Sequence, residues 1–155
     1  MEAQETVTVT LGAGWFFEGY NVGLKGSFGR FQISGNYGFK YLLGDKVDAY
    51  GLHGFYYFSK QNIFSDRRVW YARTGFTHMV WSEINRKRWG WFDTRIGRDF
   101  NIFKKFGIQA DVGFLYFVYN RYYEYASESW IDEEIRLKEK SPLWPCGSLT
   151  LFYRI

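Results

Sequence analysis

The side chains best suited to acid–base chemistry are two histidines and the carboxylates and hydroxyls that could pair with them. A serine hydrolase needs a nucleophile and a base within hydrogen-bond reach, and a carboxylate that orients the base. His53 could find Asp93 or Asp111 across the interior of a small fold, but no serine is singled out as the nucleophile. His78 and Ser82 share a strand parity, yet they lie far apart along the strand. We therefore predict no catalytic residues, and interpret His53 as a buried histidine with satisfied hydrogen bonds.

Cofactor and metal chemistry have little support in the sequence. A dinucleotide fingerprint needs a third glycine three residues after Gly14, where Phe17 stands, and a strand–helix–strand context. The lone Cys146 allows no intramolecular disulfide and no multi-cysteine metal site. Neither histidine has a second His or Cys at ligand spacing. We predict no cofactor and no metal, and interpret Gly12 and Gly14 as spacers that face the interior of a fold.

The composition favours β-structure. Aromatic residues make up 23% of the 155 residues, beside 17 glycines and only 2 prolines, and aromatic side chains prefer strands. The formal net charge of +4 is spread along the chain, and we interpret its densest group, at 86–88, as a solvated turn. No apolar stretch approaches the roughly 18 residues of a transmembrane helix. We expect a single domain over residues 1–155 and no nucleic-acid partner.

Apolar and polar residues alternate along most of the chain. In the clearest stretch, at 107–114, one parity holds Ile108, Ala110, Val112 and Phe114, and the other holds glycine, glutamine and aspartate. A strand with this period has one apolar face and one polar face. The pattern predicts eight strands, at 5–17, 21–28, 30–43, 47–59, 68–83, 88–100, 106–125 and 145–155.

Short turns between these strands favour an antiparallel up-and-down arrangement, because parallel pairs need long crossovers. An even number of strands lets the last strand pair with the first and removes both edges. We therefore predict an all-β fold, a closed antiparallel up-and-down barrel of eight strands. The long charged connection at 125–145 is expected to be a solvated loop with a short helical turn, and is the predicted place for a surface ligand.

The volume of the side chains decides which face of each strand points into the barrel. An eight-stranded barrel is only just wide enough to be filled by side chains, so it cannot hold the large aromatic set. We therefore expect the apolar face to point into lipid, with rings near strand ends forming an interfacial girdle: Trp15, Tyr50, Trp70, Trp81, Trp89, Tyr122 and Trp144. The interior is expected to be plugged by a polar network of Lys25, Arg30, Lys40, His53, Arg73, Asp93, Arg95, Asp99, Asp111 and Arg154.

The C-terminal segment at 148–155 resembles the last strand of bacterial outer-membrane barrels, which alternates in the same way and ends on a hydrophobic residue. The stretch 95–108 is similar to a hairpin of small eight-stranded outer-membrane barrels of Bacteroidetes-like bacteria. The resemblance implies recognition by the barrel-insertion machinery, through Leu149, Leu151, Tyr153 and Ile155. Ile155 departs from the family pattern, in which Phe is usual.

The resulting hypothesis is a monomeric, porin-like integral protein of the Gram-negative outer membrane, with a structural or surface-interaction role and without catalysis. Its partners would be membrane lipid and the insertion machinery. Residues 1–5 have no signal-peptide character, so this hypothesis expects a mature sequence behind an added initiator Met, or an idealised or engineered barrel. One alternative is an outer-membrane enzyme that modifies lipid A or another lipid, although the His-x-Ser pattern of lipid A deacylase barrels is missing. A second alternative is a soluble lipocalin-like lipid carrier.

Overall fold

The computed structural model describes residues 6–14, 19–42, 45–59, 69–81, 87–124, 129–132 and 143–155. Every secondary-structure element in these ranges is a strand. The strands are β1 (Thr6–Gly14), β2 (Gly19–Phe28), β3 (Phe31–Leu42), β4 (Asp45–Tyr57), β5 (Trp70–Trp81), β6 (Arg88–Asn101), β7 (Phe106–Glu124), β8 (Ser129–Asp132) and β9 (Leu143–Arg154). No helix in the described ranges is long and apolar enough to cross a membrane.

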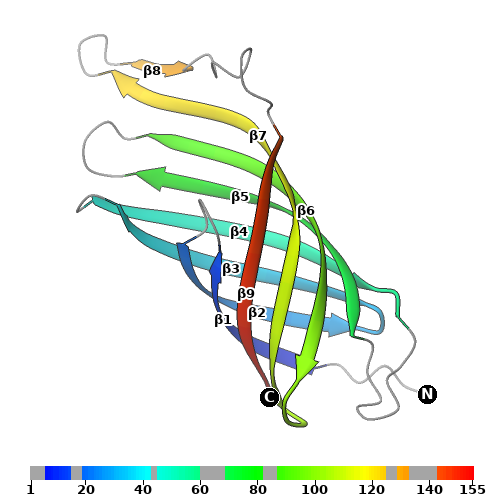
Figure 1. Ribbon diagram of the computed structural model, residues 1–155. Helices are drawn as coiled ribbons and strands as arrows, with labels where there is room; N and C mark the ends of the chain where they lie inside the picture. Colours follow the sequence, from blue (N-terminus) through cyan, green and yellow to red (C-terminus); the bar gives the residue numbers. More distant parts are fainter. Residues whose placement is uncertain are drawn as a thin grey trace.

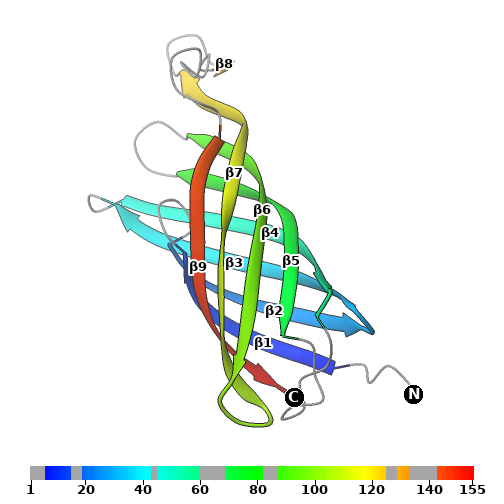
Figure 2. The same cartoon turned by 45° about the vertical axis from the view of Figure 1, so that its right-hand side comes forward.

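Eight of the strands close into a barrel (Figures 1 and 2). From β1 to β7 each strand pairs antiparallel with the next one in the chain. β9 then closes the ring, because it pairs with β7 on one side and with β1 on the other. The predicted closed antiparallel barrel of eight strands is thus confirmed.

The ninth strand lies outside this ring, at the start of the segment in which the sequence suggested a short helical turn. β7 runs on past its barrel partners, and β8 pairs with that extension from Arg121↔Asp132 to Glu124↔Ser129. Figure 1 shows the yellow end of β7 leaving the barrel with β8 beside it. Residues 129–132, where the helical turn was expected to begin, form a strand because the projecting part of β7 offers backbone groups that a paired strand satisfies. The rest of that expected turn, up to Ile135, lies outside the described residues. We call this β7–β8 extension the arm, and the barrel end that carries it the arm end.

The opposite end, where β1 starts and β9 finishes, is called the terminal end. There a two-residue turn joins β2 to β3. Gly29 occupies it with a φ of 63°, a left-handed conformation that glycine adopts without steric cost. Arg30 is the second turn residue and is exposed. Its expected place in the interior network is therefore wrong, because a turn residue lies beyond the barrel wall.

Side-chain orientation follows the alternation seen in the sequence. Along β6, Phe92 and Ile96 are exposed, whereas Asp93 and Arg95 are each 1% exposed. On seven strands of the ring two or more large apolar side chains are exposed on the outer surface, and on β5 Trp70 is. We call this outer set the apolar belt: Val7, Val9, Leu11, Tyr20, Val22, Leu24, Phe28, Phe31, Ile33, Tyr50, Leu52, Tyr56, Trp70, Phe92, Ile96, Phe100, Val112, Phe114, Tyr116, Val118, Leu143, Leu149, Leu151 and Tyr153.

The interior also holds apolar side chains, at the arm end. Trp91 and Leu115 are almost completely buried there with Val47, Ala49, Met79 and Cys146, and Trp81, Trp89, Phe117 and Trp144 pack against this cluster. The prediction that Trp81, Trp89 and Trp144 belong to an outward girdle is therefore wrong. Nearness to a strand end does not decide the side of the barrel wall, whereas strand parity does. Tyr50 and Trp70 are exposed, and the side chains of Trp15 and Tyr122 lie outside the described residues.

Candidate functional site: a charge network inside the barrel

Four charged side chains form the centre of the interior. Arg73 on β5 lies directly opposite Arg95 on β6, and Asp93 and Asp111 come from β6 and β7. Glycines face the charged residues across the sheet: Gly75 faces Asp93, Gly97 faces Asp111 and Gly113 faces Arg95. Because glycines have no side chain, they leave room for two long arginine side chains in a narrow barrel.

The four charges alternate in sign around a closed ring. Asp93 Oδ1 lies 3.5 Å from Arg73 Nε and 3.2 Å from Arg95 Nε. Asp111 accepts hydrogen bonds from Nη1 of Arg73 at 3.3 Å and from Nη1 of Arg95 at 3.2 Å. Each arginine thus contacts both carboxylates. The contacts to Asp111 are hydrogen bonds, whereas the two Nε contacts to Asp93 Oδ1 are ion pairs without a hydrogen bond. Pairing of opposite charges is what makes their burial tolerable.

Two neutral side chains also bind the ring of four charges. Tyr71 donates a hydrogen bond to Asp111 Oδ2 at 3.1 Å, and Ser148 donates to Asp111 Oδ1 at 2.7 Å. The ring of Tyr71 lies over Gly97, where an added Cβ would overlap with it. Asp111 therefore receives donors from β5, β6 and β9, and ties three parts of the barrel wall together.

His53 joins the ring through Asp93. Its Nε2 lies 3.1 Å from Asp93 Oδ2, and its Nδ1 lies 3.1 Å from Asn36 Nδ2. Because an amide nitrogen can only donate, Nδ1 is the acceptor and Nε2 carries the proton that Asp93 accepts. The Thr77 hydroxyl lies 3.4 Å from the same Nε2. Both ring nitrogens are thus engaged, and neither holds a serine or cysteine nucleophile.

A second polar group lies toward the terminal end. Asp99 accepts hydrogen bonds from Gln109 Nε2 at 2.7 Å and from Tyr57 at 3.1 Å, and Arg154 Nη2 lies 3.5 Å from it. Lys25 donates a hydrogen bond to Gln109 Oε1. The Gln109 side chain therefore links the buried lysine to the buried carboxylate.

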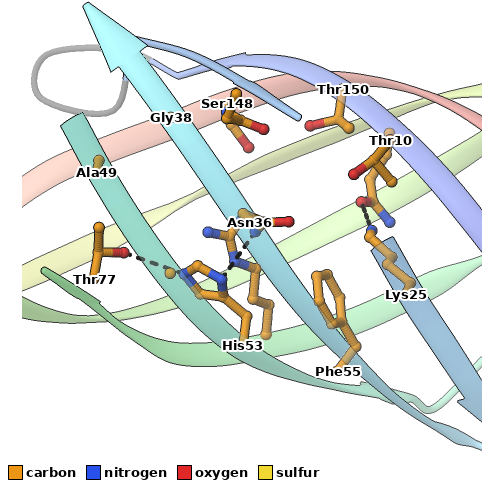
Figure 3. Close-up of a pocket in the computed structure, with 14 residues that line it drawn as sticks. Thr10, Lys25, Asn36, Gly38, Ala49, His53, Phe55, Thr77, Ser148 and Thr150 are labelled. Carbon is orange, nitrogen blue, oxygen red and sulfur yellow. Dashed lines mark hydrogen bonds between the residues drawn. The ribbon is translucent and has the colours of Figure 1, made fainter. Parts of the chain in front are cut away.

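Beside these groups the interior contains a cavity of about 520 Å³, counting the part that opens to solvent. Figure 3 shows Lys25, Thr10 and Thr150 around one part of it, and His53 with Asn36 and Thr77 around another. A smaller cavity of about 200 Å³ lies toward the terminal end. Lys25 and Gln109 line both cavities, so their hydrogen bond lies between them.

Eight of the ten residues expected in the interior network are buried inside the barrel: Lys25, His53, Arg73, Asp93, Arg95, Asp99, Asp111 and Arg154. Of the other two, Arg30 is exposed, and the side chain of Lys40 lies outside the described residues. The expected set omitted Tyr57 and Tyr71, which bind Asp99 and Asp111. Their strand parity, shared with His53 and Arg73, was the signal that places them inside.

The proposed insertion residues Leu149, Leu151, Tyr153 and Ile155 are exposed on the outer surface. Within the described ranges, no group of three or more His, Cys, Asp or Glu residues is arranged to hold a metal ion. Comparison of the chain with protein-family models, with curated proteins and with solved structures found no match. The resemblance to outer-membrane barrels therefore remains a prediction from the sequence.

Proposed function

We propose that this chain is an integral β-barrel of the bacterial outer membrane, with a structural or surface-interaction role and no catalysis. The observation that supports this proposal is the distribution of side chains. Leu52 and Val112, for example, are 64% and 71% exposed, whereas Arg95 and Asp93 are each 1% exposed. A water-soluble domain has the opposite preference, because charged residues are almost never fully buried and large apolar patches are rare.

Hydrocarbon around the barrel accounts for this distribution. The apolar belt encircles the whole ring and, in water, would be an exposed patch far beyond the few hundred Å² of ordinary monomers. In a bilayer the same surface is favourable. A closed barrel also meets the main demand of lipid, since every backbone group of a spanning strand needs an internal partner.

The proposal includes a lumen that is plugged by side chains. The ring of Arg73, Asp93, Arg95 and Asp111 crosses the interior, and the apolar cluster around Trp91 fills it at the arm end. The same ring supports a structural role over a catalytic one, because His53 uses both of its nitrogens within the network.

The arm is the candidate for a surface interaction at 125–145. Within the part of the chain that the structure describes, β8 pairs with β7 and with no other strand, so its other edge is proposed to offer backbone groups to an added strand. The remaining proposed partners are membrane lipid, around the apolar belt, and the insertion machinery, at the C-terminal strand. The proposed state is a monomer, because closure of the ring leaves no barrel edge for a second copy.

Gel mobility after refolding tests this proposal. The protein is refolded into detergent micelles and into phosphocholine vesicles, and each sample is run on SDS gels with and without boiling. A closed membrane barrel stays compact until it is boiled, so the unboiled band is expected to migrate faster. The same protein diluted from urea into buffer without detergent is the control. A folded monomer in that buffer, with one mobility before and after boiling, would contradict the membrane assignment.

A further inference from the structure

The lining of the larger cavity has an unusual chemical bias. Its described lining contains the cations Lys25 and Arg73, together with His53 and a set of hydroxyl and amide side chains, and among these residues there is no aspartate or glutamate. The hydroxyl and amide members are Thr10, Asn21, Asn36, Thr77, Gln109, Ser148 and Thr150. Such a lining supplies hydrogen-bond donors and positive charge to whatever occupies it.

Lys25 is the feature of this cavity that lacks a counter-charge. It is 5% exposed, yet within the described part of the chain it forms no ion pair with a carboxylate. Its ammonium donates to Gln109 Oε1 and lies 4.1 Å from the centre of the Phe55 ring. An ammonium has three N–H donors, and one of them makes the hydrogen bond to Gln109.

The other buried charges compensate one another. Arg73 and Arg95 share Asp93 and Asp111, and Arg154 lies beside Asp99. The buried charged residues of the described chain are thus four cations and three carboxylates, and Lys25 is the cation in excess. A buried charge without a partner is unfavourable, whereas an anion in the adjoining cavity would compensate it.

We propose that this cavity binds a small phosphate-type oxyanion, held by the Lys25 ammonium with the hydroxyl groups of Thr10 and Thr150. Thr10 lies diagonally across the β1–β2 pair from Lys25, and Thr150 lies opposite Gln109 across the β7–β9 pair. Figure 3 shows the Lys25, Thr10 and Thr150 side chains gathered at one part of the cavity. The donors would recognise the charged oxygens of a phosphate group, so the proposal covers both free phosphate and the phosphate end of a small phosphomonoester.

Calorimetric titration tests this site. Inorganic phosphate is titrated at pH 7 and constant ionic strength into refolded protein, and glycerol 3-phosphate and chloride are titrated in parallel. We expect saturable one-to-one binding of phosphate. Equal or tighter binding of glycerol 3-phosphate would assign the site to phosphomonoesters, and weaker binding would assign it to free phosphate. Saturation by chloride with the same affinity would overturn the choice of an oxyanion.

Three variants locate the site. Lys25→Met removes the cation, and is expected to weaken phosphate binding about tenfold or more, the loss typical of a charged hydrogen bond. Thr10→Asp puts a carboxylate beside Lys25 and is expected to abolish binding while keeping the lysine. Lys104→Met, at an exposed position between β6 and β7, is the matched control and should bind like the wild type.

Absence of saturable binding to the folded wild type would overturn the inference, and so would wild-type affinity in Lys25→Met. If Lys25→Met does not refold, wild-type phosphate affinity in Thr10→Asp would overturn the inference instead. The inference concerns the interior and is independent of the membrane proposal. If the barrel folds in water without detergent, the same titration is carried out in buffer, so failure of one proposal leaves the other open to its own test.

Discussion

Replacing Leu52 by arginine puts a charge on the middle of the apolar belt. Leu52 lies near the centre of β4, between Gly35 on β3 and Phe76 on β5, and is 64% exposed. If hydrocarbon surrounds this position, Leu52→Arg should lower the free energy of unfolding by about 2–4 kcal/mol, the cost of arginine near the bilayer midplane. Each 1.4 kcal/mol is a factor of ten, so the folded-to-unfolded ratio should fall roughly 30- to 1,000-fold.

Phe103→Arg is the matched control for this prediction. Phe103 is 71% exposed, but it lies between β6 and β7 at the terminal end of the barrel. An arginine near the interface costs only about 0–1 kcal/mol. In water both substitutions would be surface changes, which are usually within about 0.5 kcal/mol of the wild type.

The assay is equilibrium unfolding by urea in phosphocholine vesicles, followed by tryptophan fluorescence. The membrane assignment predicts a large loss for Leu52→Arg and a small one for Phe103→Arg. Equal stability of the two variants would refute the reasoning, because both positions are exposed and apolar and the membrane assignment puts them at different depths in the bilayer. The result does not depend on the anion site, which lies on the other side of the barrel wall.

Two further substitutions test the interior by the same unfolding assay. Asp111→Asn removes the carboxylate that Arg73 and Arg95 share, and should destabilise the barrel by about 3–5 kcal/mol, the usual cost of breaking a buried pair. Its control, Asp48→Asn, changes a half-buried carboxylate that accepts a hydrogen bond from Tyr37 and should cost about 1 kcal/mol. Equal losses of unfolding free energy in the two variants would mean that the charge ring stabilises the barrel no more than a single hydrogen bond does. Gly97→Ala places a Cβ against the Tyr71 ring and should cost about 1–3 kcal/mol. Gly35→Ala is the control: its added Cβ would meet no atom within 4 Å, so its effect on stability should be neutral or slightly stabilising. A Gly97→Ala variant as stable as Gly35→Ala would contradict the close packing over Gly97.

The sequence predicted the barrel because its signal is local and repeated. The strict alternation in β6 and β9 places each side chain on one side of the wall, whatever its neighbours are. Residues such as Asp93 and Leu149 could therefore be assigned to opposite faces from parity alone. The turn at Gly29 was also predictable, since glycine marks a conformation that other residues avoid.

Strand parity decides which side of the wall a side chain faces, but it does not decide where along the barrel axis the interior is polar and where it is apolar. Trp81, Trp89 and Trp144 face inward with the same alternation as the polar residues, yet they form an apolar cluster at the arm end. Their place near strand ends suggested an outward girdle, although Trp81 shares the parity of Arg73 and Trp89 that of Asp93, which places both rings on the inner face. β8 was missed for a related reason, because it depends on how far β7 extends beyond its barrel partners.

The amino-acid sequence by itself determined the eight strands of the barrel, their two faces and most of the charged residues that face inward. The tertiary structure alone decided which of those charges meet. The charge ring forms because of the registers of β5, β6 and β7. They place Arg73 opposite Arg95, and they place glycines opposite Asp93, Asp111 and the other side of Arg95. The same registers give Lys25 a hydrogen bond to Gln109 beside a cavity, and no ion pair with a carboxylate of the described residues. Register is a long-range property, set by closure of the whole ring, so no local pattern in the chain contains it.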